Sequence, residues 1–403
     1  MRKNMIKGFF ASAMIIALTL MPGSMSRAAN VEINETNFPD YYFRSLVSTN
    51  FDKNGDGSLS EEEIKGVSII SFPNCAHTEW SSKVSSVKGV EYFTELKKLD
   101  CQGSPISYMD LHMNTALEEL SCSATQINEL DLSQNTELTI IFCYGCKIRN
   151  LNIRNCTKLV TLKCDRNMLS DLDVSNSSEL QSLYCDNNNI KTLDITKNSK
   201  LWALTCSNNM LSELDVSHNP ELLKLYCASN PISSLDLSNN EKLWSLDCSY
   251  TKLDKLDMSK NPKMQGVYCH YCQFTSLDLS HNEELRHLVS RGEKKNYVEE
   301  DWWKKQGERT DVWQYGKNFF RTLVVDKSVE LLGLKRINDC NEDGEINRAD
   351  RMYLSRSLAG WKGYEMPGKD VADINNDGEV NRADRIYLAR ALAGWEGYIL
   401  KQE

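Results

Sequence analysis

The chain has 403 residues, enough for two or three domains that each bury a core of their own. Its 56 acidic and 47 basic residues give a net charge of −9, which argues against nucleic acid as the main partner, because phosphate backbones attract basic proteins. Fourteen cysteines would ordinarily indicate a disulfide framework in an exported protein. Nine of them recur every 21 residues, however, and this regularity indicates a structural repeat instead of paired bridges.

Residues 1–28 have the pattern of a secretory signal peptide. Arg2, Lys3 and Lys7 precede an apolar stretch over residues 8–20, and small residues up to Ala28 offer a cleavage site. A membrane anchor is the alternative, but the stretch is shorter than the ~20 residues that span a bilayer. The sequence therefore predicts a secreted, extracellular protein that is associated with a scaffold or a cell surface and is not inserted in a membrane.

Residues 30–95 are expected to form a helical cap with one calcium loop. The stretch from Phe38 to Val47 has the apolar spacing of an amphipathic helix. Oxygen-bearing side chains then occupy positions 1, 3, 5, 7, 9 and 12 of an EF-hand-type loop, with Gly57 at the sixth place. These side chains belong to Asp52, Asn54, Asp56, Ser58, Ser60 and Glu63. One structural Ca²⁺ is the expected occupant.

Residues 96–285 hold nine copies of a 21-residue unit. Each unit carries one cysteine at the same phase, namely Cys101, Cys122, Cys143, Cys164, Cys185, Cys206, Cys227, Cys248 and Cys269. An asparagine also returns late in most units, at Asn114, Asn135, Asn198, Asn219, Asn240, Asn261 and Asn282. A unit of this length cannot bury its apolar residues alone, so successive units are expected to stack and share one core.

The repeat frame L-x-x-L-x-C-x-x-N-x-I-x-x-L-x-L resembles the leucine-rich repeat, with Cys in place of the third strand Leu. In this it is similar to the cysteine-ladder subgroup of bacterial internalin-like proteins. The resemblance implies an α/β-type solenoid of short parallel strands. Neighbouring strands lie ~4.8 Å apart, wider than the ~3.8 Å between Cβ atoms that a disulfide needs, so we expect free buried thiols. A metal or redox array of cysteines is the alternative.

A row of aromatic residues is expected on the concave face of the solenoid. Side chains alternate along a strand, so the residue between the strand Leu and the ladder Cys should point outward. Every second repeat has an aromatic residue there, at Phe142, Tyr184, Tyr226 and Tyr268. Such residues stack on sugar rings and are also enriched in protein interfaces. The row therefore predicts a ligand face, expected to stand clear of the core, and leaves protein and glycan open as ligands.

Residues 286–335 lose the repeat and are expected to form a β-type C-terminal cap and linker. The segment F-F-R-T-L-V-V over residues 319–325 has the composition of a strand that closes the stack. An aromatic sugar-binding platform around Trp302 and Trp303 is the alternative.

Residues 336–403 contain a second repeat, with an offset of 34 residues between its halves. The two halves agree at 19 of 26 positions, and each begins with D-x-N-x-D-G-E-x-N-x-x-D. Carboxylate, amide and carbonyl oxygens at this spacing surround a hard cation such as Ca²⁺. The predicted ligands are Asp339, Asn341, Asp343, Glu345 (carbonyl), Asn347 and Asp350, and then Asp373, Asn375, Asp377, Glu379 (carbonyl), Asn381 and Asp384.

Asp at loop position 12, with one exiting helix per loop, resembles the type I dockerins of cellulosome components. The resemblance implies a small all-α domain with two Ca²⁺ ions and, as partner, a cohesin module of a scaffold protein. Recognition residues in that family lie at loop positions 10 and 11 and along the helix. Here these are Arg348, Ala349, Arg351 and Arg356, and Arg382, Ala383, Arg385 and Arg390. They depart from the Ser-Thr pair of the best-known clostridial dockerins, which leaves the class of cohesin open.

The sequence shows no catalytic constellation. No insertion interrupts the repeats to hold a carboxylate pair, there is no G-x-S-x-G motif, and the six histidines are scattered. We therefore expect a non-catalytic binding or adhesion subunit that is held on an extracellular scaffold and whose repeat array binds a ligand. The alternatives are an accessory glycan-binding component of polysaccharide degradation and a glycoside hydrolase.

Overall fold

The computed structural model describes residues 30–72, 83–291, 293–295, 310–314, 322–326, 328–332, 348–359, 372, 374 and 379–393. The predicted signal peptide, the Trp302–Trp303 region and much of both C-terminal calcium loops lie outside these residues.

A small cap of two helices and one pair of short antiparallel strands begins the described chain. Strand β1 (Val31–Glu32) pairs antiparallel with β2 (Ser58–Leu59), and helix α2 (Glu61–Lys65) follows. Helix α1 (Tyr41–Asn50) starts later than the expected residue 38, because the Asp40 side chain accepts hydrogen bonds from the backbone N–H groups of Tyr42 and Phe43, at 2.9 Å each. Phe38 lies before the helix and is fully buried.

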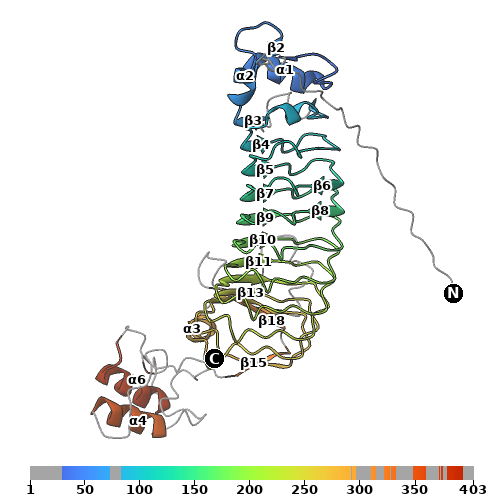
Figure 1. Ribbon diagram of the computed structural model, residues 1–403. Coiled ribbons are helices and arrows are strands. Elements are labelled where there is room, and N and C mark those ends of the chain that lie inside the picture. The colour runs from blue at the N-terminus through green and yellow to red at the C-terminus, as the bar shows by residue number, and fades with distance from the viewer. Residues whose placement is uncertain are drawn as a thin grey trace, which may run out of the picture.

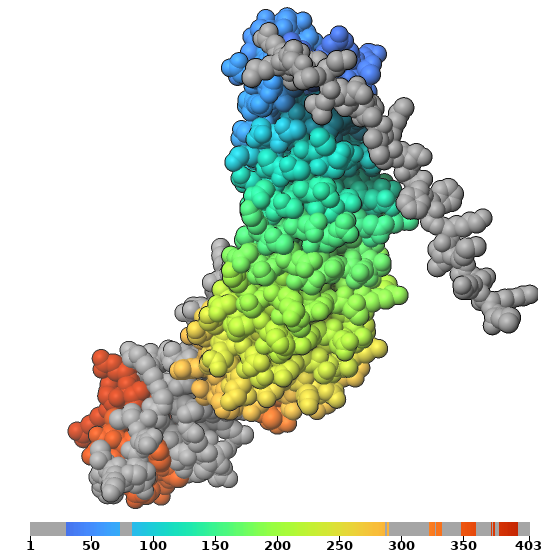
Figure 2. All heavy atoms as spheres, in the orientation of Figure 1, coloured from blue at the N-terminus to red at the C-terminus, as the bar shows by residue number. Residues whose placement is uncertain are grey.

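Nine short parallel strands build the array, each starting 21 residues after the one before. They are β4 (Lys98–Asp100), β5 (Glu119–Ser121), β7 (Ile140–Phe142), β9 (Thr161–Lys163), β10 (Ser182–Tyr184), β11 (Ala203–Thr205), β12 (Lys224–Tyr226), β13 (Ser245–Asp247) and β14 (Gly266–Tyr268). They pair in register, with Leu183 opposite Leu162 and Leu204. Figure 1 shows the resulting stack and Figure 2 its continuous, elongated body. The predicted leucine-rich-repeat solenoid is confirmed.

Further strands and a helix complete both ends and the opposite side of the stack. Strand β3 (Ile69–Ser71) pairs in parallel with β4 at the N-terminal end of the sheet, and the 3₁₀ turn Val90–Tyr92 lies between the two strands in sequence. Strands β6 (Glu129–Asp131) and β8 (Asn150–Asn152) pair with each other and lie on the opposite side of the stack from the nine array strands in Figure 1. A second such pair joins β15 (Ser276–Asp278) to β19 (Glu330–Leu332).

The C-terminal end of the array is closed by strands. After helix α3 (Glu283–Arg291), strand β18 (Thr322–Asp326) adds to β14 in parallel. Strands β17 (Thr310–Gln314) and β16 (Glu293–Lys295) then extend the sheet antiparallel. The expected closing strand over residues 319–325 is confirmed for the part that the structure describes, and the β-type C-terminal cap with it.

The interior of the array is a column of thiols and aliphatic side chains. All nine ladder cysteines are fully buried and free, as expected. Burial raises the pKa of Cys185 well above that of an ordinary thiol, so this ladder thiol stays protonated at neutral pH. The thiols therefore pack as small apolar groups.

Two ladders of asparagine side chains hold the turns together inside the array. In the first, Asn188 donates to the carbonyls of Cys164 (3.0 Å) and Cys185 (3.1 Å), and its Oδ1 accepts from the N–H of Leu169 (3.0 Å). Asn167, Asn209 and Asn230 repeat these bonds. The second ladder is the late asparagine of the repeat, in which Asn219 donates to the carbonyls of Ile195 and Asn198. Buried turn carbonyls that strands cannot pair are thereby satisfied.

Helices α4 (Arg348–Leu358) and α6 (Arg382–Leu392) belong to the C-terminal repeat and have a core of their own. Leu354 and Leu388 are fully buried there with Ala372 and Ile374. No described helix combines the length and the apolar character needed to cross a membrane.

Candidate functional site

The outward-facing residues of the nine array strands (β4, β5, β7 and β9–β14), together with the residue after each ladder cysteine, form one continuous surface, here called the strand face. It corresponds to the expected concave face. The four predicted aromatic residues lie there in a single row, because the strands pair residue for residue: Phe142 is opposite Lys163, and Lys163 is opposite Tyr184. Tyr226 and Tyr268 continue the row on β12 and β14.

Lysine side chains cover part of this aromatic row. The ammonium nitrogen of Lys163 lies 5.1 Å from the ring centroid of Phe142 and 4.9 Å from that of Tyr184. Lys224 lies over the ring of Tyr226, 4.1 Å from its centroid. A cation over an aromatic face is attracted by the ring quadrupole. The row is therefore a mixed surface of rings and ammonium groups and not a bare aromatic platform.

The tyrosines are also more deeply set than the sequence predicts. We expected their side chains to lie outside the core, but Tyr226 and Tyr268 are only partly exposed, and burial raises the pKa of both. The Tyr226 hydroxyl lies 3.2 Å from the Ser245 hydroxyl of the next strand. The rings thus pack against neighbouring turns, and their removal would cost stability as well as binding surface.

Three carboxylates on the same face are poorly hydrated. Burial raises the pKa of Asp165, Asp186 and Asp247. The Asp186 side chain accepts hydrogen bonds from the Thr205 hydroxyl and from the backbone N–H of Ser207 (2.7 Å). These groups give the strand face hydrogen-bond acceptors beside its rings and cations.

Sequence reasoning missed an exposed tryptophan on the rim of this face. Trp202 comes directly before β11 and is 40% exposed, and Trp244 takes the same place before β13. Backbone bonds of 2.9 Å tie Trp202 to Gln181 and to Leu223 in the neighbouring turns. The sequence signal was the recurrence of Trp after 42 residues, the same double period that spaces the aromatic row.

A stacked tyrosine pair was missed as well. The rings of Tyr250 and Tyr271 are 4.7 Å apart and inclined by 20°, and the backbone of both residues is left-handed, with φ of 57° and 56°. Gly103 and Asn187 occupy the equivalent position elsewhere in the array. A bulky side chain is unfavourable in the left-handed backbone conformation. Tyr at this position of the repeat was therefore the sequence signal that could have pointed to the pair. The buried His270 ring contacts both, and burial lowers its pKa to about 4, so it is neutral.

The predicted ligands Asp52 and Glu63 of the N-terminal loop hydrogen-bond to the backbone of the loop itself. Asp52 accepts hydrogen bonds from the N–H groups of Gly55 and Gly57. Glu63, 7% exposed, accepts from the N–H groups of Lys53 and Ser60, at 2.8 Å each. Nowhere in the described chain do three or more His, Cys, Asp or Glu side chains gather as a metal site would require. The oxygen donors suit Ca²⁺ chemically, and the cap site stays a prediction.

Glu63 makes the cap sensitive to acid. Hydrogen bonds from the backbone and side chain of Ser60, and from the backbone of Lys53, lower the pKa of Glu63 from 4.5 to about 2. A carboxylate with a lowered pKa stabilises the fold above its unfolded pKa, and this contribution disappears as the pH falls from 4.5 toward 2. Protection factors for hydrogen exchange in α1 and α2, which correct for the slower intrinsic exchange in acid, should therefore fall over this range, and less steeply in Glu63→Gln than in the exposed control Glu62→Gln. Equal acid profiles for the two variants would contradict this role.

The second C-terminal loop closes on its position-12 carboxylate in the same way. Asp384 is fully buried and accepts hydrogen bonds from the N–H groups of Ile374 (2.7 Å) and Asn381 (2.8 Å). These are loop positions 2 and 9, the positions that bond Glu63 in the N-terminal loop. Asp350, its counterpart in the first half, is also fully buried. Eight predicted ligands lie outside the described residues: Asp339, Asn341, Asp343, Glu345, Asn347, Asp373, Asn375 and Asp377.

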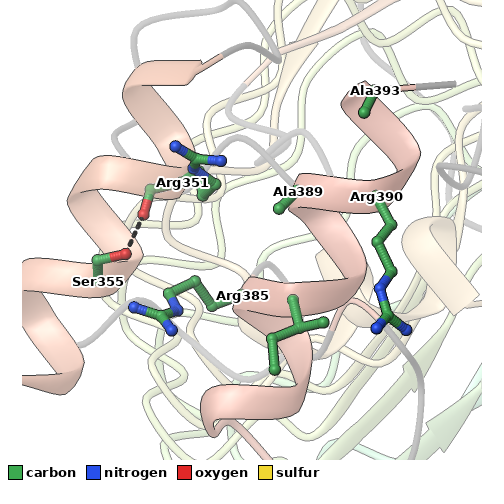
Figure 3. A pocket seen from close by; sticks show the side chains of 7 residues that line it. Arg351, Ser355, Arg385, Ala389, Arg390 and Ala393 are labelled. Atoms are coloured by element: carbon green, nitrogen blue, oxygen red, sulfur yellow. Dashed lines mark hydrogen bonds between the residues drawn. The ribbon is translucent and has the colours of Figure 1, made fainter. Parts of the chain in front are cut away.

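The predicted recognition residues all lie on α4 and α6. Arg348 and Arg382 are the first residues of the two helices and are exposed. Ala383 is exposed, whereas Ala349 is half-buried. Arg351, Arg356, Arg385 and Arg390 follow along the helices and are half-buried. Some of these side chains meet in a cleft between α4 and α6, shown in Figure 3.

Comparison with known sequences identifies the C-terminal repeat. Residues 337–393 match the family described as the Dockerin type I domain. Type I dockerin domains bind calcium, and the buried Asp384 with its loop contacts fits such a site. No curated protein matches the chain.

Solved structures similar to this chain include internalins and leucine-rich-repeat proteins. The functional domain of InlJ from Listeria monocytogenes, which includes a cysteine ladder, is 25% identical over 65% of this chain and 75% of that one, with a TM-score of 0.36. An internalin (inlF) from the same species is 19% identical over 62% and 94%, with a TM-score of 0.31. A leucine-rich-repeat protein from Leptospira interrogans is 19% identical over 47% and 56%, with a TM-score of 0.43. The chain therefore joins a parallel-strand solenoid with a ladder of buried cysteines to a C-terminal repeat that matches the Dockerin type I domain.

Proposed function

We propose that this protein is a secreted, non-catalytic binding subunit that docks onto an extracellular scaffold and presents a ligand-binding solenoid. The observation that carries the proposal is the match of residues 337–393 to the Dockerin type I domain. A dockerin implies cohesin-mediated attachment, as in a cellulosome. In this proposal residues 30–95 and 286–335 cap the array of residues 96–285, and residues 336–403 form the docking module.

Calcium in this proposal is structural. The two loops of the docking module hold one Ca²⁺ each, and the N-terminal cap holds a third. The ions would neutralise closely spaced carboxylates, so that Asp350 and Asp384 can be buried at the starts of the two helices. The protein's own residues fix the loops, as the bonds from Ile374 and Asn381 to Asp384 illustrate.

The strand face is the proposed ligand site, and a protein is the ligand that its chemistry favours. Rings, ammonium groups and carboxylates alternate there, at Tyr184, Lys163 and Asp186 for example, and Lys163 takes up the space between two rings where a sugar would stack. Protein interfaces combine aromatic residues with charges in this way. A glycan, and with it an accessory role in polysaccharide degradation, is the second candidate, favoured by the aromatic row.

The test captures the full-length protein through its docking module, so that the strand face stays free. The captured protein is exposed to a glycan array and, in parallel, to proteins of the native culture. Any ligand found is then titrated against the double variant Tyr184→Ser, Trp202→Ser, which removes rings from the face and its rim. We expect its affinity to fall about tenfold or more, because exposed aromatic residues carry much of the energy of an interface.

The control is Met210→Ser. Met210 is an apolar residue about as exposed as Trp202, and it lies in the turn that follows the ladder cysteine Cys206. It should leave affinity unchanged. A ligand that binds the double variant as tightly as the wild type would exclude this part of the strand face as the ligand site.

A further inference from the structure

The cleft between α4 and α6 gathers arginines from both halves of the docking module. Its volume is about 530 Å³. Arg351 and Ser355 of α4 line it together with Arg385, Ala389 and Arg390 of α6. Figure 3 shows the side chains of Arg351 and Arg385 reaching into the space between the two helices.

Two of these arginines are equivalent positions of the internal repeat. Arg351 and Arg385 are 34 residues apart, the offset that relates the two halves. The same offset relates Ser355 to Ala389. Both pairs of equivalent residues line the same cleft. The cleft therefore lies where the halves meet and presents both arginines together, whichever half faces a partner.

The cleft is strongly cationic. Each helix carries three arginines and one aspartate, and the aspartates, Asp350 and Asp384, are fully buried at the loops. Among the described residues, Arg351 and Arg385 have no carboxylate partner, and the exposed Glu379 does not line the cleft. A guanidinium group binds a carboxylate through paired hydrogen bonds, and such charge-assisted bonds are the strong ones.

We propose that the Arg351–Arg385 cleft selects a cohesin that carries carboxylate side chains on its docking face. This inference rests on the proposed docking function and adds the chemistry of the partner. An acidic residue of the cohesin enters the cleft and pairs with both guanidinium groups. Because the two arginines come from different halves of the module, this contact is kept whichever of the two helices, α4 or α6, makes the larger contact with the cohesin.

The experiment measures binding of the full-length protein, in calcium, to recombinant cohesin modules of known sequence that range from acidic to neutral. The tightest binder should be acidic, and its Kd should rise steeply with salt. The double variant Arg351→Gln, Arg385→Gln should weaken this binding about 100-fold and flatten its salt dependence, because two charge-assisted contacts are lost. The variant Arg351→Lys, Arg385→Lys keeps the charge without the paired donors and should lose about tenfold.

The control variant Arg149→Gln, Arg154→Gln removes the same charge from exposed positions of the solenoid and should bind as the wild type does. Calcium-dependent helicity of each variant checks that the module is folded, and the lysine variant tests the cleft if the glutamine variant does not fold. Wild-type affinity in both cleft variants, or a neutral cohesin as tightest binder, would overturn the inference and leave docking intact. Failure of the wild-type protein to bind any cohesin would instead overturn the docking proposal itself.

Discussion

Removal of calcium is expected to unfold the docking module and leave the solenoid folded. The module has a small core of Leu354, Leu388, Ala372 and Ile374, and two fully buried aspartates. Calcium at a thousandfold excess over its Kd stabilises a fold by about 4 kcal/mol, which is a large part of the stability of a small domain. The array, by contrast, shares one continuous apolar core that spans its nine turns. Its stability should depend little on the ion.

Calorimetry of the full-length protein with calcium and with a chelator tests this expectation. With calcium we expect the docking module and the array to unfold in separate transitions. With chelator the transition of the module should disappear at ambient temperature, while that of the array persists. Asp384→Asn should reproduce the loss in calcium, because it removes the carboxylate that closes the second loop. A single transition that shifts as a whole with calcium would show that the two parts are not independent.

Replacement of Asn188 by alanine is expected to destabilise the array strongly. The side chain satisfies the carbonyls of Cys164 and Cys185 and the N–H of Leu169, all inside the fold. Asn188→Ala leaves these groups without partners where water does not reach. Each buried group left unpaired costs about 1–3 kcal/mol, so we expect a loss of about 3 kcal/mol or more. Stacked repeats also depend on their neighbours, so the damage extends to the adjacent turns.

Chemical denaturation followed by circular dichroism measures this loss. The control is Asn189→Ala, one residue further along the chain, where the side chain is exposed and should matter by less than about 0.5 kcal/mol. Equal stability of the two variants would mean that the asparagine ladder does not hold the turns.

The solenoid could be predicted from the sequence because each unit repeats its neighbours at several positions at once. Cys185 and the leucine two residues before it, Leu183, stand over their counterparts in the next turn, so one unit defines the whole array. The closing strand β18 was predictable for a related reason: a short run of apolar residues followed an array that needed an end. The C-terminal helices followed from their duplicated sequence.

The details of the strand face were not predictable in the same way. Alternation along a strand shows that Tyr184 and Tyr226 point outward, but not that lysines lie over their rings or that neighbouring turns half-bury Tyr226. Those features depend on which rotamers fit between strands 21 and 42 residues apart. Trp202 was missed because the residue type at its position differs from repeat to repeat, so the repeat frame assigns no role to that position. The start of α1 was missed because Asp40 caps the helix after Pro39.

Binding of the full-length protein to immobilised cohesin modules, in calcium and then in chelator, tests the central claim most directly. We expect saturable binding to at least one cohesin, released when the chelator is added, with the array still folded in the released protein. Calcium-dependent helicity shows in parallel that the docking module is folded. A folded module that binds no cohesin in calcium, or a complex that survives the chelator, would contradict the claim that a calcium-dependent dockerin attaches this solenoid to its scaffold.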